Sequence, residues 1–308
     1  KKVGEILIKL KSINKETSTI GIIAPASTDD IEKATENINF FRSLGYKIKI
    51  GKNIFNTYGY LAGTDKERAD DINRMFADKD VDAIICYRGG YGSIRMANYL
   101  DLNTIKKNPK IFCGYSDITL LLNYINKKCR FPTFHGPMIN SNFNDPMTKD
   151  YFTNILENIN SKITYNLKDI CGNNLKVYNS RDFKGKLVGG NLSIICSTLG
   201  TPYEIKFKKN ILLIEEVNES PYVVDRMLSQ LISCGKLKNL QGIILGHFTD
   251  CTSSKNTLTI EEIIEEKLVP LNIPIIKHFP CGHDYPNITM PIGVKFKYDS
   301  KKNLLIQE

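Results

Sequence analysis

Residues 110–125 read KIFCGYSDITLLLNYI, and this stretch decides how the fold is interpreted. The short apolar run at 111–113 is typical of a buried strand, and the leucine-rich run at 118–125 predicts a buried helix. GYSD at 114–117 forms a tight turn between them, so Ser116 lies where a strand turns sharply into a helix. That position exposes a hydroxyl at the carboxyl edge of a sheet and directs helix N-terminal amides toward it. A serine nucleophile requires both features.

The same serine has a simpler interpretation. Serine is favoured at helix N-caps, so Ser116 could do no more than begin the helix. The nucleophile-elbow pattern G-x-S-x-G is also incomplete here, because Ile118 occupies the position of its second glycine. This stretch alone leaves a catalytic and a structural role open.

Strands and helices alternate on both sides of this stretch through the first half of the chain. The alternation predicts βαβ units and a doubly wound, mostly parallel α/β sheet with helices on both faces. Functional sites in such sheets form beyond the carboxyl ends of the strands, where RGGYG at 88–92 and Ser116 both lie. Strands are predicted at 19–24, 47–50, 83–87, 111–115 and 131–137, and helices at 29–44, 64–76, 93–100 and 117–125.

The second half of the chain has a different texture. Residues 140–181 are rich in Asn, Asp and Lys, and we interpret them as a helix at 148–159 followed by a linker. Further strands are predicted at 186–188, 211–215, 242–245, 274–277 and 294–298, and helices at 192–199, 225–234 and 259–268. We expect an N-terminal parallel-sheet domain at 1–145, a helix and linker at 146–182, and a smaller C-terminal mixed α/β domain with a strand-rich core at 183–308.

The overall composition excludes several classes of function. The 308 residues are 42% hydrophobic and 24% charged, as in ordinary soluble globular proteins. The net charge of +9 comes from scattered lysines rather than a basic stripe, so nucleic-acid binding is not expected. No run of eighteen apolar residues is present, so no membrane span is expected. The start of the chain lacks the apolar core of a secretory signal, and we expect no export.

The eight cysteines form no C-x-x-C motif and no zinc-type spacing with histidine. Several lie in apolar runs, where free cysteine acts as a small core residue, and we expect a structural role for Cys281 as well. The sequence therefore predicts a reduced, cytoplasmic protein without a metal or other cofactor.

A serine nucleophile needs a base, and the chain has only four histidines: His135, His247, His278 and His283. His283 lies in PCGHD at 280–284, a loop bounded by glycine and proline that can be placed over another domain. We therefore favour His283 as the base, and expect each of the others to be structural or to contact substrate.

The base in turn needs an orienting carboxylate. ILLIEE at 211–216 runs four aliphatic residues into Glu215 and Glu216. Because a buried acid without a partner is costly, at least one of the two should be paired, and either could hold an imidazole N–H. A solvated strand end is an equally good interpretation of the pattern.

The RGGYG loop at 88–92 matches neither a P-loop nor the dinucleotide-binding fingerprint. Its glycines leave backbone amides open to close approach. A Gly89 or Gly90 N–H could therefore be one oxyanion donor, with the Asp117 N–H as the second. A simple tight turn would require the same glycines.

A series of short motifs covers nearly the whole chain: IIAPAS at 22–27, RGGYG at 88–92, GYSD at 114–117, HGP at 135–137, GGNL at 189–192, EEV at 215–217, PY at 221–222, DRML at 225–228 and GH at 282–283. In this order they resemble the LD-carboxypeptidase (muramoyltetrapeptide carboxypeptidase) family of serine peptidases. The resemblance implies an N-terminal domain of the flavodoxin or class I glutamine-amidotransferase type. It also implies a homodimer and a Ser-Glu-His catalytic set split between two domains. Carried over by motif, Ser116 is the nucleophile, Glu215 rather than Glu216 the acid, and His283 the base.

The resemblance also implies an activity, the release of terminal D-alanine from murein tetrapeptide during cell-wall recycling. The bond hydrolysed joins an L-configured centre to a D-residue, and the reaction passes through an acyl-enzyme on Ser116. A carboxypeptidase must also hold a free terminal carboxylate, for which Arg88 and Asn191 are candidates. His135 is a third expected substrate contact.

Two alternatives remain open. A relative in the same family confers immunity to microcin C by cleaving an acyl-sulfamoyl aminoacyl-nucleotide, with tryptophan taking part in stacking on the base. The present chain has no tryptophan, although Tyr and Phe can stack. The second alternative is a non-catalytic ligand-binding protein of doubly wound fold, in which Ser116 is only an N-cap.

Overall fold

The computed structural model describes residues 9–254 and 256–308. The chain forms two compact units. Unit 1 runs to Phe143 and adds Lys149–Ser161 and Thr289–Gly293, whereas unit 2 comprises Asn144–Thr148, Lys162–Ile288 and Val294–Glu308. Much of the lysine-rich start used for the export prediction, residues 1–8, lies outside the described residues.

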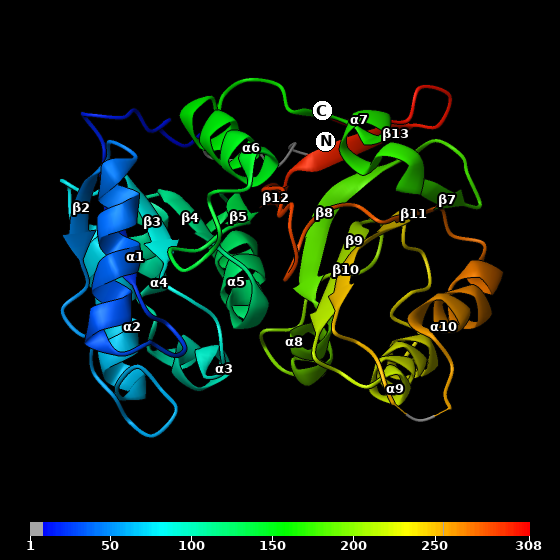
Figure 1. The fold of residues 1–308 in the computed structure, drawn as a ribbon, viewed down its shortest axis with the longest axis horizontal. Coiled ribbons are helices and arrows are strands. Elements are labelled where there is room, and N and C mark those ends of the chain that lie inside the picture. Colours follow the sequence, from blue (N-terminus) through cyan, green and yellow to red (C-terminus); the bar gives the residue numbers. More distant parts are fainter. Residues whose placement is uncertain (1–8, 255) are drawn as a thin grey trace. The chain divides into compact units, whose positions relative to one another are not determined.

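Unit 1 is built on a six-stranded sheet in the order β12-β5-β4-β3-β1-β2 (Figure 1). The first five strands of the chain are parallel in the order 2-1-3-4-5, which is the flavodoxin-like order, and only β12 is antiparallel. The predicted doubly wound, mostly parallel sheet is confirmed. The strands are β1 (Thr19–Ile23), β2 (Lys47–Ile50), β3 (Ala83–Cys86), β4 (Ile111–Gly114), β5 (Thr133–His135) and β12 (Met290–Ile292).

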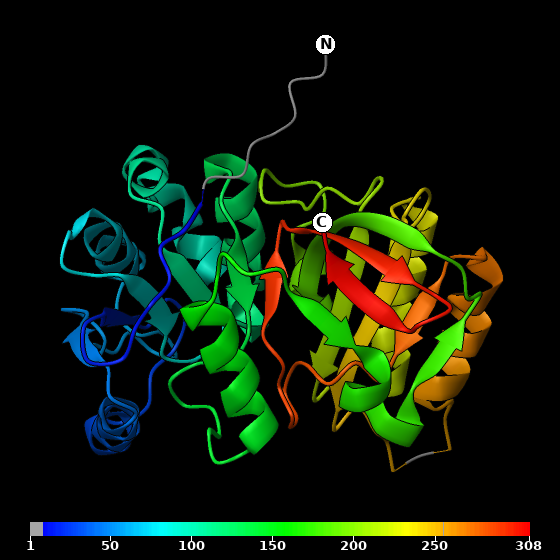
Figure 2. The ribbon, with the colours of Figure 1, turned by 90° about the horizontal axis from the view of Figure 1, so that it is seen from above.

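Burial of the strands in unit 1 explains their sequences. Strands β3 and β4 are buried at every residue, and such strands read as continuous apolar runs because helices cover both faces (Figure 2). Edge strand β2 reads KIKI and exposes both of its lysines, which discourages pairing with another chain. The helices are α1 (Ile31–Ser43), α2 (Asp65–Ala77), α3 (Ser93–Met96), α4 (Leu102–Lys107) and α5 (Thr119–Cys129), with 3-10 turns η1 (Ala97–Tyr99) and η2 (Ser116–Ile118).

Unit 2 contains an eight-stranded mixed sheet in the order β6-β14-β13-β8-β9-β10-β11-β7. Its four central strands, β8 to β11, are parallel, and antiparallel strands flank them on both sides. The strands are β6 (Thr164–Asn166), β7 (Lys176–Tyr178), β8 (Phe183–Asn191), β9 (Ile211–Val217), β10 (Gly242–Thr249), β11 (Ile275–Lys277), β13 (Lys295–Asp299) and β14 (Leu304–Gln307). The predicted mixed α/β architecture with a strand-rich core is confirmed.

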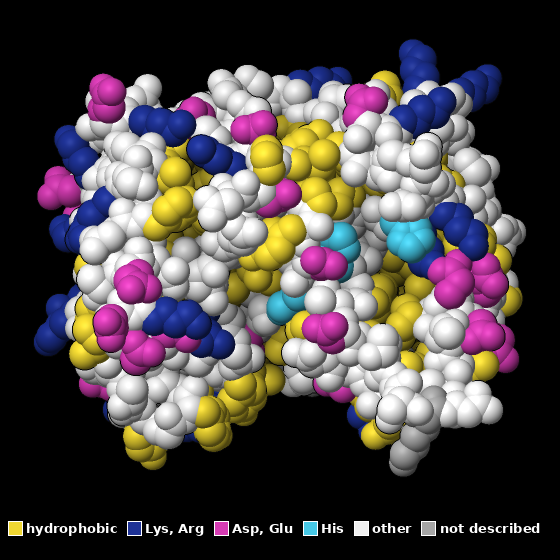
Figure 3. All heavy atoms as spheres, viewed as in Figure 1, with side chains coloured by type: hydrophobic (Ala, Val, Ile, Leu, Met, Phe, Trp, Pro, Cys, Tyr) yellow, Lys and Arg dark blue, Asp and Glu magenta, His cyan; other side chains and the backbone are white. Residues whose placement is uncertain are grey.

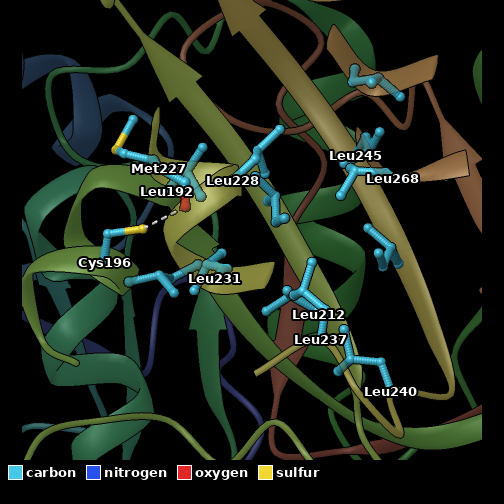
Figure 4. Packing of buried hydrophobic residues seen from close by; sticks show 14 of the residues in the cluster. Leu192, Cys196, Leu212, Met227, Leu228, Leu231, Leu237, Leu240, Leu245 and Leu268 are labelled. Atoms are coloured by element: carbon cyan, nitrogen blue, oxygen red, sulfur yellow. Dashed lines mark hydrogen bonds between the residues drawn. The ribbon is translucent and has the colours of Figure 1, made fainter. Parts of the chain in front are cut away.

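The helices of unit 2 are α7 (Leu167–Cys171), α8 (Leu192–Ser197), α9 (Pro221–Ser233) and α10 (Ile260–Lys267), with 3-10 turns η3 (Gly172–Asn174) and η4 (Val269–Leu271). Apolar side chains of α8 and α9 pack against β9 and β10, and Figure 4 shows Leu192, Leu228 and Leu212 in this core. Burial of each leucine side chain stabilises the folded state by about 1.5–3 kcal/mol relative to an exposed one.

Two predicted features of the chain are corrected by the strand pairing. The segment interpreted as a linker contributes β6 and β7 to the second sheet, where they pair with β14 and β11. Strand β12 lies within 183–308 but pairs with β5 of unit 1. Helix α6 (Pro146–Glu157) matches the helix predicted at 148–159 to within two residues at each end.

The surface and the helix lengths add two observations. Basic and acidic side chains are interspersed on the face seen in Figure 3, rather than gathered into a basic stripe. Within residues 9–254 and 256–308, none of the helices has the length and apolar character needed to cross a bilayer.

Candidate active site

The turn after β4 holds Ser116 in an unusual backbone conformation. Its φ of 64° is left-handed, which costs a non-glycine residue about 1–3 kcal/mol and is concentrated at functional sites. The caps of η2 and α5 are Tyr115 and Ile118, without a side-chain cap hydrogen bond in either case. The interpretation of Ser116 as a simple N-cap is therefore wrong. What remains is a serine on a strained strand-to-helix turn.

Ile118 replaces the second glycine of the elbow pattern without opening the turn. A Cβ on Gly114 would lie 3.0 Å from Cγ2 of Ile118, so the isoleucine packs directly over the glycine that ends β4. In the usual pattern a glycine after the serine leaves room in the turn. Here Gly114, before the serine, leaves that room for the Ile118 side chain.

The RGGYG loop lies against the same serine. A Cβ on Gly89 would lie 2.7 Å from Ser116 Cβ and 2.8 Å from its Oγ, so only glycine fits there. The same Cβ on Gly89 would lie 3.5 Å from the backbone nitrogen of Asp117. The loop backbone and the amide after the serine thus flank the hydroxyl, as donors to a developing oxyanion must.

In unit 2, Glu215 near the end of β9 contacts His283. Glu215 Oε2 lies 2.6 Å from Nδ1 of His283, and the carboxylate is fully buried. Gly282 has a φ of 115°, and a Cβ on it would lie 2.7 Å from Glu215 Oε2. Glycine is therefore required immediately before the histidine. A buried carboxylate at Nδ1 fixes the orientation and the tautomer of the imidazole.

The neighbouring acid, Glu216, has a different set of partners, because successive residues of a strand point to opposite faces. It accepts hydrogen bonds from the Asn191 amide at 2.9 Å, from the Ser193 N–H and hydroxyl at 2.8 Å each, and from the Val217 N–H at 2.9 Å. Burial raises the pKa of Glu216, and these hydrogen bonds oppose the shift. Glu216 thus anchors the start of α8.

The loop that carries His283 is fixed by hydrogen bonds of Asn287, which sequence reasoning missed, and of His247. The Gly282 N–H donates to Asn287 Oδ1 at 3.0 Å, and Nε2 of His247 lies 3.0 Å from the Pro286 carbonyl. The His247 N–H also donates to the Cys281 carbonyl at 2.9 Å. His247 is structural here, one of the two roles expected for it. The only sequence signal for Asn287 was its position in the loop after the histidine.

Cys281 is fully buried, and burial raises the pKa of its thiol well above the usual range. Every cysteine in the described parts of the chain is free. No group of three or more His, Cys, Asp or Glu suited to a metal ion occurs within residues 9–254 and 256–308.

Arg88, one of the three predicted substrate contacts, remains accessible. It forms an ion pair with Asp29, and its side chain is 35% exposed. Tyr87 donates to the second oxygen of Asp29 at 2.7 Å, so this acid, which sequence reasoning did not single out, orients the arginine. The remaining N–H groups of the guanidinium are available to bind an anion.

The other two predicted contacts do not fit their surroundings. His135 is fully buried in β5, between β4 and β12, and cannot reach a substrate in this conformation. Asn191 is the N-cap of α8, where its Oδ1 accepts from the Ile194 N–H and its Nδ2 donates to Glu216. Both polar atoms of its side-chain amide thus form hydrogen bonds within unit 2.

Comparison with known proteins places the whole chain in one family. The LD-carboxypeptidase N-terminal domain matches residues 20–136, and the LD-carboxypeptidase C-terminal domain matches residues 184–297. A probable murein peptide carboxypeptidase of Bacillus subtilis (strain 168) is 38% identical over 314 residues, covering 100% of this chain and 97% of the relative.

Two solved structures resemble both units of the chain. The structure of MccF in complex with glutamyl sulfamoyl guanosine has a TM-score of 0.88 and 27% identity, covering 97% of each chain. The muramoyltetrapeptide carboxypeptidase from Oxalobacter formigenes has a TM-score of 0.82 and 28% identity, covering 94% of this chain and 98% of that one. From the two matched domains and the relative aligned over 97% of its length, we conclude that the chain belongs to the LD-carboxypeptidase family.

Proposed function

We propose that this chain is a serine-type carboxypeptidase that hydrolyses an L,D-peptide bond and releases terminal D-alanine from murein tetrapeptide. The observation that carries the proposal is the 2.6 Å contact between Glu215 and Nδ1 of His283. A buried carboxylate in that position is how a histidine base is oriented in serine hydrolases. The strained turn at Ser116 supports the assignment of the nucleophile. The names of the relatives from B. subtilis and O. formigenes support the substrate.

The proposed reaction begins with attack of Ser116 Oγ on the carbonyl of the scissile bond, while Nε2 of His283 takes the hydroxyl proton. The negative charge that develops on the carbonyl oxygen is stabilised by the Asp117 N–H and by the N–H of Gly89 or Gly90. His283 then protonates the amine of the leaving D-alanine. Water, deprotonated by the same histidine, hydrolyses the acyl-enzyme and restores the serine.

Recognition of the free carboxylate of D-alanine is assigned to Arg88. Its guanidinium is partly exposed, and Asp29 occupies one side of it. An arginine fork with remaining donors binds a carboxylate in a fixed orientation. Arg88 is preferred over Asn191 and His135, since the amide of Asn191 forms hydrogen bonds at the start of α8 and His135 is buried.

Three further proposals concern the roles of the two domains, the oligomeric state and the location of the protein. The parallel-sheet domain predicted at 1–145 carries the nucleophile, and the domain predicted at 183–308 carries the acid and base. A homodimer rests on the family resemblance alone, and sedimentation equilibrium tests it. A cytoplasmic location is supported by the free cysteines.

A second candidate activity is cleavage of an acyl-sulfamoyl aminoacyl-nucleotide. The observation in its favour is the TM-score of 0.88 with MccF bound to glutamyl sulfamoyl guanosine. The absence of tryptophan from the chain weighs against it, because base stacking would fall to tyrosine or phenylalanine.

A panel of substrates separates these activities. Purified protein is incubated with murein tripeptide, tetrapeptide and pentapeptide and with an acyl-sulfamoyl adenosine, and the products are identified by mass spectrometry. We expect D-alanine from the tetrapeptide alone. Preferential cleavage of the nucleotide would establish the second activity, and binding without cleavage of any substrate would establish a ligand-binding protein.

A further inference from the structure

Arg68, in the first turns of α2, is a fully buried cation that neither the resemblance nor the proposed reaction explains. Its side chain has no exposed surface, although arginine is among the residues least often buried. It forms a close ion pair with Asp65, and Nε donates to the Gly63 carbonyl at 3.3 Å. Nη1 donates to two further carbonyls, those of Pro25 and of Gly92, the latter at 3.0 Å.

These three carbonyls come from three different loops at one edge of the sheet. Pro25 follows β1, Gly63 lies between β2 and α2, and Gly92 ends the loop after β3. Only arginine has enough donors in a rigid fork to serve three backbone acceptors and a carboxylate together. Strands β1 and β3 are neighbours at the point where the strand order reverses, which is where doubly wound folds bind ligands.

The peptide group between Gly92 and Ser93 is held from both sides. Arg68 binds its carbonyl, and Asp117 Oδ2 accepts its N–H at 2.8 Å. Asp117 is buried and directly follows Ser116, so the loop is fastened to the nucleophile turn itself. A planar peptide group held at both ends cannot rotate. Gly92 has a φ of 129°, and a Cβ there would lie 2.8 Å from the guanidinium, so this contact requires glycine.

The other end of the loop is fixed by Ser27, two residues after Pro25. Its hydroxyl donates to the Gly89 carbonyl at 2.6 Å, and its own N–H donates to the same oxygen at 3.3 Å. In a trans peptide group the N–H points away from the carbonyl, so the Gly90 N–H is directed away from Ser27. Arg68 therefore contacts the loop directly at Gly92 and acts on Gly89 through the segment that carries Ser27.

We propose that Arg68 is a positioning residue for catalysis, which holds the glycine loop so that its amides face the oxyanion formed on attack by Ser116. This inference rests on the proposed function, because it assigns Arg68 a role through the donors of Gly89 and Gly90. Loss of an oxyanion donor lowers kcat about 10²–10³-fold in serine hydrolases. Misorientation of the donor by release of one loop is expected to lower kcat about 10–100-fold.

The test measures kcat and KM for D-alanine release by Arg68→Met, Arg68→Lys and Ser27→Ala. Arg74→Met is the matched control, because Arg74 lies on the same helix with its side chain 62% exposed. We expect Arg68→Met and Ser27→Ala to lower kcat with KM unchanged to within about twofold, and Arg68→Lys to recover part of the loss. The double variant Arg68→Met/Ser27→Ala should lose less than the product of the two single losses, because both changes release one loop.

Each outcome decides the inference. A folded Arg68→Met enzyme with the kcat of Arg74→Met, or a loss confined to KM, would overturn it. If Arg68→Met fails to fold, Ser27→Ala decides alone, and an unchanged kcat in that variant overturns the inference. Failure of the proposed function looks different, since the unsubstituted protein would then release no D-alanine at all.

Discussion

Ser116 in unit 1 is placed by its own backbone, whereas His283 in unit 2 is placed by a carboxylate 68 residues away along the chain. The nucleophile turn lies between a strand and a helix that follow directly on each other, and its neighbour Gly89 lies in the loop after the adjacent strand β3. The histidine lies in a loop, and its orientation depends on Glu215 in β9. The proposed nucleophile is thus placed by a local motif, whereas the proposed base is placed by the tertiary fold of unit 2.

This difference explains which parts of the site the sequence predicts. GYSD and RGGYG carry their geometry in adjacent residues, so local rules were enough to place both at strand ends. The catalytic role of Ser116 came from the family resemblance, because the local pattern left it open. The choice between Glu215 and Glu216 could not be made from residue types, because it depends on which face of β9 each acid occupies. The two acids occupy opposite faces of the same strand, and only one faces His283.

The largest expected effect comes from the nucleophile. Replacement of Ser116 by alanine removes the attacking oxygen, and we expect D-alanine release to fall by about 10⁴-fold or more. Relief of the strained turn is not expected to destabilise the fold, so the thermal midpoint should be unchanged or slightly higher. Product release is measured by mass spectrometry and unfolding by calorimetry. Full activity in a folded Ser116→Ala protein would show that Ser116 is not the nucleophile.

The next effect tests how Glu215 orients the proposed base, His283. In Glu215→Gln the orienting carboxylate is lost while its volume is kept, and we expect kcat to fall by about 10³–10⁴-fold. A neutral amide can also select the wrong tautomer of His283. Steady-state kinetics of D-alanine release measures the change, and a loss below tenfold would mean that the histidine is not held by this acid.

Glu216→Gln is the matched comparison one residue further along. This change leaves the contact with His283 untouched but weakens the bonds to Asn191 and Ser193 at the start of α8. We expect a loss of about 1–3 kcal/mol in the free energy of unfolding, with kcat within a few-fold of the original. Urea denaturation and the same kinetic assay report the two quantities. If Glu216→Gln were as inactive as Glu215→Gln, the assignment of different roles to the two acids would be wrong.

The smallest effect concerns pH. Burial raises the pKa of Glu216 above its usual value of 4.5. Between pH 4.5 and the raised pKa, Glu216 therefore keeps its proton in the folded state but has lost it in the unfolded state. The stability contributed by this proton is present below pH 4.5 and is lost as the pH rises through the raised value. The stability of the original protein relative to Glu216→Gln should therefore decrease as the pH rises from about 4.5.

Thermal midpoints of both proteins across the acid range check this trend. The control is Glu36→Gln on an exposed position of α1, which should show no such change. An advantage of the original protein that grows with pH would mean that hydrogen bonds, not burial, dominate the pKa of Glu216.

The same contrast between local and tertiary structure accounts for the errors in the fold. Strands β6, β7 and β12 have three residues each, too few for a periodic pattern, and their pairing partners are distant in sequence. The long apolar strands and the capped helix α2, by contrast, were predicted to within a few residues. Burial of Arg68 escaped notice because a charged residue in a helical pattern indicates an exposed face.

One measurement tests most directly the claim that Ser116, Glu215 and His283 act together. The rate of covalent labelling by a fluorophosphonate is followed by mass spectrometry in the original protein, Glu215→Gln and Glu216→Gln, with the labelled residue identified by peptide mapping. We predict labelling at Ser116, slowed at least about 100-fold by Glu215→Gln and little changed by Glu216→Gln. Labelling at another residue, or equal rates in all three proteins, would contradict the account.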